Sequence, residues 1–200
     1  MYSKPIHILI RALSRLPSVG PRTAERFVFH LLKSGKKEVA DLSLALQELM
    51  RTIRSCEICF DFADRTPCGI CSNKKRDQET IAVVAEPQDV QAIEKIGMYN
   101  GVYHILRGTL SADMEEHNSG IKINELLKRI KTSKVKEVIL ALNPNMDGET
   151  TMMFLEQEIK RNSPTVIVSR LARGLPTGSE LQYADEITLE NALKSRTVLK

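Results

Sequence analysis

The stretch CEICFDFADRTPCGIC, residues 56–71, contains all four cysteines of the 200-residue chain. They form two C-x2-C pairs, Cys56 with Cys59 and Cys68 with Cys71, separated by eight residues. Two such pairs supply the four thiolates of a closed tetrahedral zinc site. Because the segment is too short to bury a core of its own, we expect a structural zinc ion to hold it together. The segment also divides the chain into a front part and a longer back part.

Other cysteine chemistries fit this segment less well. Disulfides require an oxidising compartment, and the N-terminal sequence MYSKPIHILIRAL has neither the long apolar run nor the cleavage site of a signal peptide. A redox C-x-x-C usually stands alone beside a strand and a helix, whereas two pairs occur here. An iron–sulfur cluster uses the same ligands, and the spacing alone leaves that alternative open.

The composition is that of a soluble globular protein with one medium domain or two small ones. Hydrophobic residues make up 42% and charged residues 27% of the chain. Aromatic residues reach only 4% and tryptophan is absent, so we do not expect base stacking to be the main binding mode. No apolar run approaches the length of a membrane span. We therefore expect a cytoplasmic protein without a membrane partner.

The positive charge lies in front of the cysteine segment. Residues 1–55 hold ten Lys/Arg against four Asp/Glu, a surplus of six, whereas residues 56–200 hold nineteen against twenty-one, a deficit of two. Such asymmetry favours an anionic partner for the front part, most simply nucleic acid. The alternative is a solvated helical face, and charge alone does not separate the two.

The front part is expected to form a helical hairpin. Apolar side chains recur at helical spacing over residues 6–16, and Pro17 should end this helix because the residue before a proline disfavours helical geometry. Gly20 permits a tight turn. Pro21 then starts a second helix, which Gly35 closes.

This hairpin presents basic side chains beside a helix N-terminus, where free backbone N–H groups form an anion site. Arg22 lies on the first turn of the second helix, and Arg26 follows one turn later on the same face. The stretch LPSVGPRTA, residues 16–24, resembles the helix-hairpin-helix loop usually written LPGVGxxxA, which binds DNA phosphates without reading sequence. Ser18 stands where the first glycine commonly sits. We expect Arg22 and Arg26 to contact DNA; the alternative is a hairpin that only packs helices together.

A third helix leads into the cysteines. Its apolar residues recur at steps of three and four, which favours a role in the core or in a subunit contact. They are Val39, Leu42, Leu46, Leu49, Met50 and Ile53.

The back part alternates short apolar runs with helical patterns, which indicates a mostly parallel sheet with helical crossovers. We expect strands over residues 80–86, 102–106, 135–142 and 165–169, helices over 87–97, 121–131 and 150–160, and a polar loop at 111–120. Functional groups should collect at the carboxyl ends of the strands. Glu86 and the turn at residues 143–149 lie there.

This arrangement resembles the Toprim fold of type IA topoisomerases, primases and related nucleases. In that fold a glutamate ends the first strand and a turn of the form DPDREGE ends a later one; here the turn reads NPNMDGE, residues 143–149. Asn143 and Asn145 replace the two aspartates that usually help to hold magnesium. Uncharged amides ligate a hard cation weakly, and phosphoryl-transfer chemistry depends on that metal.

The remaining acids of the Toprim-like region favour a protein-docking surface over a catalytic centre. These are Glu86, Asp89, Asp147 and Glu149. No tyrosine nucleophile stands out among the four tyrosines of the chain, Tyr2, Tyr99, Tyr103 and Tyr183.

The tail, ARGLPTGSELQYADEITL at residues 172–189, is expected to form a structured loop and a short strand before a terminal helix, NALKSR at 191–196. Its glycines match neither the P-loop nor the dinucleotide fingerprint, so ATP hydrolysis is not expected. In order, the hairpin, the cysteine segment, the Toprim-like region and this tail resemble the family of RecR recombination mediators over essentially the whole chain. The family's Walker B-like segment corresponds to residues 181–185.

The resemblance implies an α+β multidomain fold. Its parts are a helix-hairpin-helix region (1–54), a four-cysteine zinc finger (55–76), a Toprim domain (79–170) and a strand–helix tail (171–200). It implies a non-enzymatic protein that forms a ring-shaped tetramer around DNA and works with RecO and RecF to load RecA onto single strands. Arg22 and Arg26 take the DNA-facing positions, and Glu86, Asp147 and Glu149 take those at the RecO contact.

Two rival functions remain open on the sequence. The first is a Mg²⁺-dependent Toprim nuclease or topoisomerase-like enzyme, because Glu86, Asp147 and Glu149 are retained. The second is a plain DNA-binding module whose back part only stabilises the ring.

Overall fold

The computed structural model describes residues 2–111 and 120–197. The chain divides into two compact units, residues 1–53 and 54–200. None of the helices in the described ranges is long and apolar enough to cross a membrane. The finer division into four parts stays a prediction, and most of the loop expected at 111–120 lies outside the described residues.

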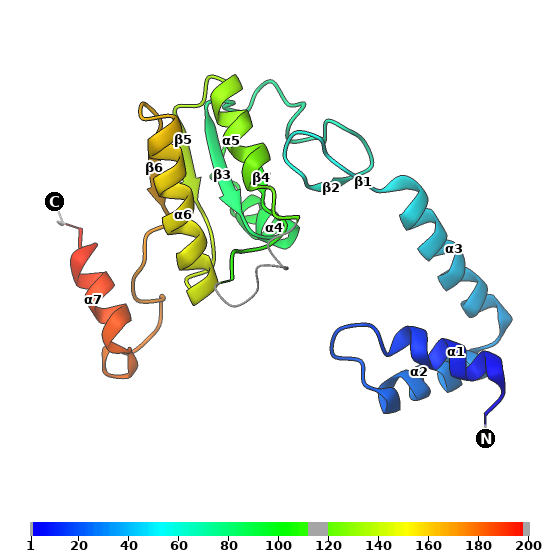
Figure 1. Cartoon of the computed structure of the whole chain (residues 1–200). Helices are drawn as coiled ribbons and strands as arrows, with labels where there is room; N and C mark the ends of the chain where they lie inside the picture. Colours follow the sequence, from blue (N-terminus) through cyan, green and yellow to red (C-terminus); the bar gives the residue numbers. More distant parts are fainter. Residues whose placement is uncertain (1, 112–119, 198–200) are drawn as a thin grey trace. The chain divides into compact units, whose positions relative to one another are not determined.

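The first unit consists of α1 (Lys4–Leu13), α2 (Pro21–Ser34) and α3 (Lys36–Thr52) (Figure 1). The expected hairpin of helices is present, but α1 ends at Leu13, before the expected residue 16. Ser14 caps it, because the Ser14 backbone N–H and hydroxyl both donate to the Ile10 carbonyl, at 2.9 and 2.8 Å. Ala24 and Val28 of α2 are 0 and 1% exposed and form the small core of this unit.

The apolar stripe of α3 is not part of that core. Its six members are each at least 36% exposed. Within this chain the expectation that they form core is therefore wrong, and a subunit contact stays a prediction.

The second unit is built on a four-stranded parallel sheet of order β4-β3-β5-β6. Its strands are β3 (Thr80–Val84), β4 (Val102–Ile105), β5 (Glu137–Leu140) and β6 (Ile167–Arg170). The helices are α4 (Pro87–Ile96), α5 (Ile123–Thr132) and α6 (Met146–Asn162). Gly97 ends α4 with φ 70°, as expected of a glycine in the left-handed region.

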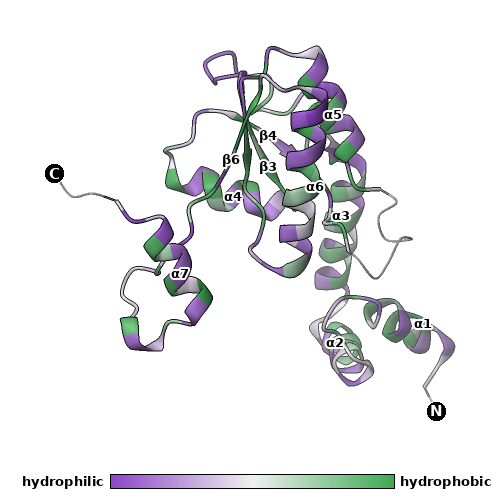
Figure 2. Ribbon diagram, turned by 60° about the vertical axis from the view of Figure 1, so that its left-hand side comes forward, coloured by the Kyte–Doolittle hydropathy of each residue, from purple (hydrophilic) through white to green (hydrophobic). Residues whose placement is uncertain are grey.

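Both faces of the sheet are covered, which explains why β3 is apolar and buried at every position from Ile81 to Val84. Ile81 and Val83 pack against α5 and α6, whereas the alternate residues Ala82 and Val84 pack against α4 and the cysteine segment. Figures 1 and 2 show α5 and α6 on one side of the sheet and α4 on the other. The cysteine segment itself contains a two-residue antiparallel ladder, β1 (Arg54–Ser55) with β2 (Phe62–Ala63).

The tail differs from expectation, because the described residues after β6 contain no strand. A short 3-10 helix, η2 (Leu181–Tyr183), is followed by α7 (Glu186–Lys194), which begins earlier than the expected residue 191. Asp185 caps α7: its carboxylate accepts the Thr188 backbone N–H at 2.9 Å and the Thr188 hydroxyl at 2.7 Å. This cap outweighs the strand preference of the β-branched residues that follow it.

Candidate functional site

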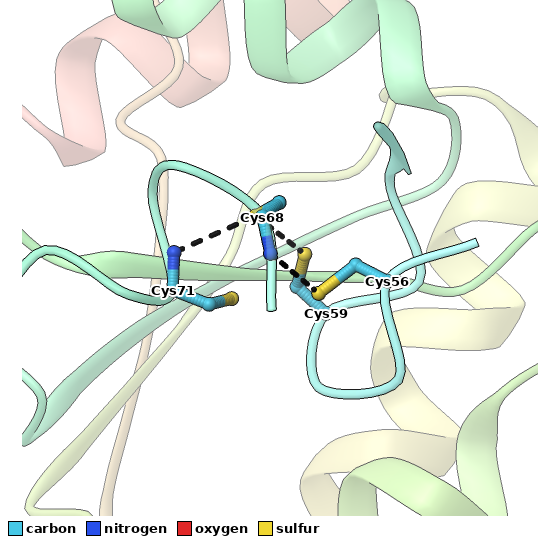
Figure 3. A group of neighbouring side chains, drawn as sticks. All are labelled: Cys56, Cys59, Cys68 and Cys71. Carbon is cyan, nitrogen blue, oxygen red and sulfur yellow. Dashed lines mark hydrogen bonds between the residues drawn. The ribbon is translucent and has the colours of Figure 1, made fainter. Parts of the chain in front are cut away.

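The four cysteines form one cluster. Figure 3 shows that Cys56 and Cys59 come from one loop and Cys68 and Cys71 from a second loop facing it. All four sulfur atoms lie within 4.8 Å of one another. The Cys59 and Cys68 sulfurs are 3.6 Å apart, too far for a disulfide of about 2.05 Å. Tetrahedral zinc with bonds of about 2.3 Å places its sulfurs about 3.8 Å apart, so the cluster fits that metal.

Backbone N–H groups donate hydrogen bonds to two of the sulfurs. The Cys68 N–H donates to the Cys56 sulfur at 3.4 Å, and the Cys71 N–H donates to the Cys68 sulfur at 3.5 Å. The hydrogen bond between Cys59 and Cys68 raises the pKa of the Cys59 thiol and lowers that of Cys68. One thiolate is thus favoured at the expense of its neighbour, so four thiolates together require the charge of a bound cation.

The cluster belongs to the core of the sheet. Cys56, Cys59 and Cys68 are 0, 2 and 4% exposed. They pack with residues of β3, α4 and β4, namely Ala82, Val84, Val90, Tyr103 and Ile105. The Cys59 carbonyl also accepts the Ile105 N–H at 2.8 Å, at the edge strand β4. The segment therefore buries its apolar side against the sheet, which sequence reasoning missed; the signal was that β3 is apolar on both faces.

Two arginines that sequence reasoning did not single out tie this segment to the sheet. Arg129 of α5 donates through one terminal nitrogen to the Tyr103 carbonyl at 2.7 Å and the Ile58 carbonyl at 3.3 Å. Burial lowers the pKa of Arg129, and the neighbouring cysteines oppose that shift. Arg107 donates to the Phe60 carbonyl at 2.7 Å. Nothing in the spacing of these arginines marks them, because their carbonyl partners are distant in sequence.

The hairpin carries Arg22 and Arg26 on the exposed surface of α2. Gly20 is the N-cap and Pro21 begins the helix, so the first backbone N–H groups point outward as expected. Ser18 has φ 61°, the left-handed conformation that the more usual glycine adopts readily. The turn thus keeps the backbone course of the motif despite the serine. Contact between these arginines and DNA stays a prediction.

The two acids that follow β3, Glu86 and Asp89, cap the N-terminus of α4. Glu86 is the N-cap of α4, and its backbone N–H donates to the Asp89 carboxylate at 2.9 Å in a capping box. Both acids sit at the carboxyl end of β3, where the sequence placed them.

The NPNMDGE turn is largely helical, which corrects the expectation that α6 begins at Thr150. Asn145 caps α6, since its side-chain oxygen accepts the Gly148 N–H at 2.8 Å. Asp147 and Glu149 therefore lie in the first helical turn. A side chain at Gly148 would collide with the Asn143 carbonyl oxygen, so only glycine fits there.

Glu149 has an internal partner. It is 35% exposed and forms an ion pair with Arg173, which follows β6. Of the described residues, only the four cysteines come together as three or more side chains that could hold a metal ion.

The hairpin, the four-cysteine segment and the parallel α/β unit define a class of multidomain nucleic-acid-associated proteins with a Toprim domain. Family profiles agree: residues 6–50 match "RecR, helix-hairpin-helix", residues 79–172 match "Toprim domain" and residues 174–197 match "RecR, C-terminal". The recombination protein RecR of Moorella thermoacetica is 44% identical over 199 residues, covering 100% of this chain and 99% of the relative. That of Gloeobacter violaceus is 45% identical, covering 98% of each. The chain belongs to the RecR family of recombination proteins.

Proposed function

We propose that the protein is a non-enzymatic mediator of recombinational DNA repair, acting in the cytoplasm at the nucleoid. It binds single- and double-stranded DNA without sequence specificity and forms a tetrameric ring. With RecO and RecF as partners it loads RecA onto single-stranded DNA.

One observation carries the non-enzymatic part of this proposal: the groups of the Toprim edge are engaged within the protein. Asn145 and Asp89 cap helices, and Arg173 neutralises Glu149. Asn143 and Asn145 stand at the two positions where the Toprim turn usually has aspartates. A divalent ion needs charged oxygens that converge on one point, and phosphoryl transfer needs that ion. Asp147, together with Glu86 and the exposed part of the Glu149 side chain, instead suits a basic surface of RecO.

The cofactor is proposed to be one structural zinc ion per chain. The four sulfurs, three of them on buried cysteines and the fourth on the half-buried Cys71, leave no open coordination position for a substrate, which is the mark of a structural site. The ring is supported by apolar side chains that the single chain leaves exposed. They lie on α3 and on the tail, where Leu181, Ile187 and Leu193 are 64, 70 and 66% exposed.

The order of the strands is the observation that favours the rival function, a Mg²⁺-dependent Toprim enzyme. Since β3 and β5 are neighbours, Glu86 and the first turn of α6 follow adjacent strands. A tyrosine nucleophile, however, would need an accessible phenolate. Burial raises the pKa of both Tyr99 and Tyr103, whose hydroxyls donate to the Val102 carbonyl and to Glu94. Tyr2 and Tyr183 are exposed, but both lie outside the Toprim match at residues 79–172.

The hairpin is tested by replacing Arg22 and Arg26 with alanine. Affinity should fall about equally for unrelated sequences, and the slope of log K against log salt should become shallower by about 1.5–2 units. Fluorescence polarisation at several salt concentrations measures both. The double variant Lys33→Ala/Lys37→Ala, with the same charge loss further from the turn, is the control. Wild-type binding by Arg22→Ala/Arg26→Ala would make the hairpin purely structural.

The acidic turn is tested with Asp147→Asn/Glu149→Gln, compared with Glu156→Gln/Glu158→Gln further along α6. Only the first pair should weaken RecO binding, by about 2–5 kcal/mol if the charges are desolvated in the complex. Both variants lose ion pairs within the chain, to Arg173 in the first and to Lys160 and Arg161 in the control, so their melting temperatures should be similar. Calorimetry with purified RecO measures this. Mg²⁺-dependent DNA cleavage by the wild type, lost in Asp147→Asn/Glu149→Gln, would instead establish the rival enzyme.

A further inference from the structure

The second unit has a basic edge, although residues 56–200 together carry more Asp/Glu than Lys/Arg. The stretch LLKRIKTSKVK, residues 126–136, holds five Lys/Arg and no Asp or Glu. It forms the second half of α5 and the connection into β5. Because helices and strands run in opposite directions in a parallel α/β unit, this stretch lies at the amino edge of the sheet. Glu86, Asp147 and Glu149 lie at the opposite, carboxyl edge, together with Arg107, Arg170 and Arg173.

Three of these cations are available for an outside partner. Arg129 points inward to two backbone carbonyls, and Lys136 is paired with Glu79 at 2.5 Å. Lys128 and Lys134 are exposed and have no ion-pair partner within residues 2–111 and 120–197. Lys131 is exposed and donates only to the neutral Asn162 side chain, at 3.0 Å.

The acids closest to these lysines in sequence are Glu125 and Glu137, and each has another partner. Glu125 pairs with Lys122 at 2.9 Å, and Glu137 accepts the Ser169 hydroxyl at 2.6 Å. Glu158 of α6 lies 3.9 Å from Arg161. The other cation at the end of α6, Lys160, is paired with Glu156. The positive charge of the edge is therefore concentrated on Lys128, Lys131 and Lys134.

The surface around these lysines is hollowed and polar. Lys128, Thr132 and Ser133 line a hollow of about 430 Å³ against the cysteine segment. Ser133 and Lys134 line a second, of about 410 Å³, and Lys128, Lys131 and Thr132 a third, of about 450 Å³. Acids also line these hollows, Glu57 and Glu125 in the first, Glu79 in the second and Glu158 in the third. Of these, Glu125, Glu79 and Glu158 are paired with other cations. Lysine and hydroxyl side chains are the groups that contact phosphate oxygens in nucleic-acid complexes. Among the described residues, no large exposed apolar side chain lies between positions 99 and 145, so an apolar protein interface is disfavoured.

A helix-dipole role does not account for the set. Cations stabilise a helix C-terminus within its last turn, which covers Lys131. Lys134 lies beyond the end of α5 at Thr132, and Lys128 lies four residues before that end.

We infer that Lys128, Lys131 and Lys134 form a second surface that contacts the phosphate backbone of DNA, separate from the hairpin. The inference goes beyond the proposed function and rests on it only in that the protein binds DNA. This second contact would hold DNA against the Toprim unit while Asp147 at the opposite edge stays available for a basic partner.

The test compares Lys128→Gln/Lys131→Gln/Lys134→Gln with Lys74→Gln/Lys75→Gln/Lys95→Gln, which removes the same charge from exposed lysines elsewhere in the unit. Binding of a 30-base-pair duplex is measured by fluorescence polarisation from 50 to 300 mM salt. The first variant should lose affinity by about tenfold or more at 0.1 M salt, and its salt slope should become shallower by about 2–3 units. Melting temperature and solution mass should match those of the control.

Each outcome decides between the surfaces. Equal slopes and affinities for the two triple variants overturn the second surface. Arg22→Ala/Arg26→Ala, measured alongside, reports on the hairpin separately: wild-type binding by that variant contradicts the hairpin but not the lysines. Combining the hairpin and lysine changes should make the salt slope shallower by the sum of the two separate effects.

Discussion

At the scale of single residues, His104 is the clearest example of a polar group confined by the fold. It is fully buried in β4, and its Nε2 donates to the Lys122 carbonyl at 2.7 Å. The carbonyl can only accept, so Nδ1 is the unprotonated nitrogen of the neutral ring, and it has no hydrogen-bond partner among the described residues. Burial lowers the pKa of His104 to about 4, from an ordinary value of 6.5. The site thus holds a histidine that must stay neutral.

This burial predicts a pH dependence of stability. Between pH 6.5 and about 4 the unfolded chain binds a proton at His104 that the folded protein does not. The free energy of unfolding should therefore fall as the pH drops through this window, by about 3 kcal/mol in total, and this contribution should be fully present above pH 6.5. Urea unfolding at several pH values measures it.

The variant His104→Gln isolates this contribution, because glutamine keeps a donor for the Lys122 carbonyl but does not titrate. Its stability should vary less with pH than that of the wild type. Parallel pH profiles for wild type and His104→Gln would show that His104 is not the titrating group.

At the scale of elements, the cysteine segment is a part of the sheet's core, and we expect it to depend on the proposed metal. Its sulfurs replace the apolar side chains that would otherwise cover Ala82 and Val84. Cys56→Ser, or removal of metal by a chelator, should therefore unfold the second unit and not only residues 56–71. Structural zinc contributes about 10–16 kcal/mol in small peptides, as much as a whole domain's stability of about 5–15 kcal/mol.

Thermal unfolding with elemental analysis measures this effect, with the neighbouring Ser72→Ala as the control. Hydrogen exchange at the Ile105 amide, which bonds the Cys59 carbonyl, should accelerate when metal is lost. Metal-free protein with the wild-type melting temperature and a protected Ile105 amide would contradict a structural role for the metal.

The elements also show what the sequence could and could not predict. Hydrophobic periodicity and the C-x2-C pairs predicted the hairpin, the parallel sheet and the cysteine cluster, because each leaves a pattern that can be read over neighbouring residues. Element ends were less predictable: Asn145 and Asp185 begin their helices early through side-chain caps that compete with the pattern behind them. The partners of Arg129 and Arg173 were unpredictable, since they depend on which distant backbone or carboxylate the fold brings near.

At the scale of the whole molecule, the chain exposes more apolar surface than a monomer usually leaves in water. On α3, Val39, Leu42, Leu46 and Leu49 follow a helical repeat of three and four residues and are 42, 46, 56 and 54% exposed. A contiguous stripe of this kind marks an interface between proteins. It agrees with the proposed ring, in which the first unit of one subunit contacts another subunit.

This stripe predicts how the assembly can be broken. Leu42→Glu/Leu46→Glu places two charges in the centre of the stripe, and burying them in an interface would cost several kcal/mol, so the tetramer should dissociate into smaller species. Leu44 is a matched control: it is 62% exposed on the same helix but points to the opposite side from Leu42 and Leu46. Leu44→Glu should therefore leave the oligomer intact. Light scattering coupled to size exclusion measures the solution mass.

Because a ring encloses DNA more firmly than its parts do, Leu42→Glu/Leu46→Glu should also release circular DNA faster although Arg22 and Arg26 are unchanged. Equal masses for both variants would move the subunit contact from α3 to the exposed residues of the tail.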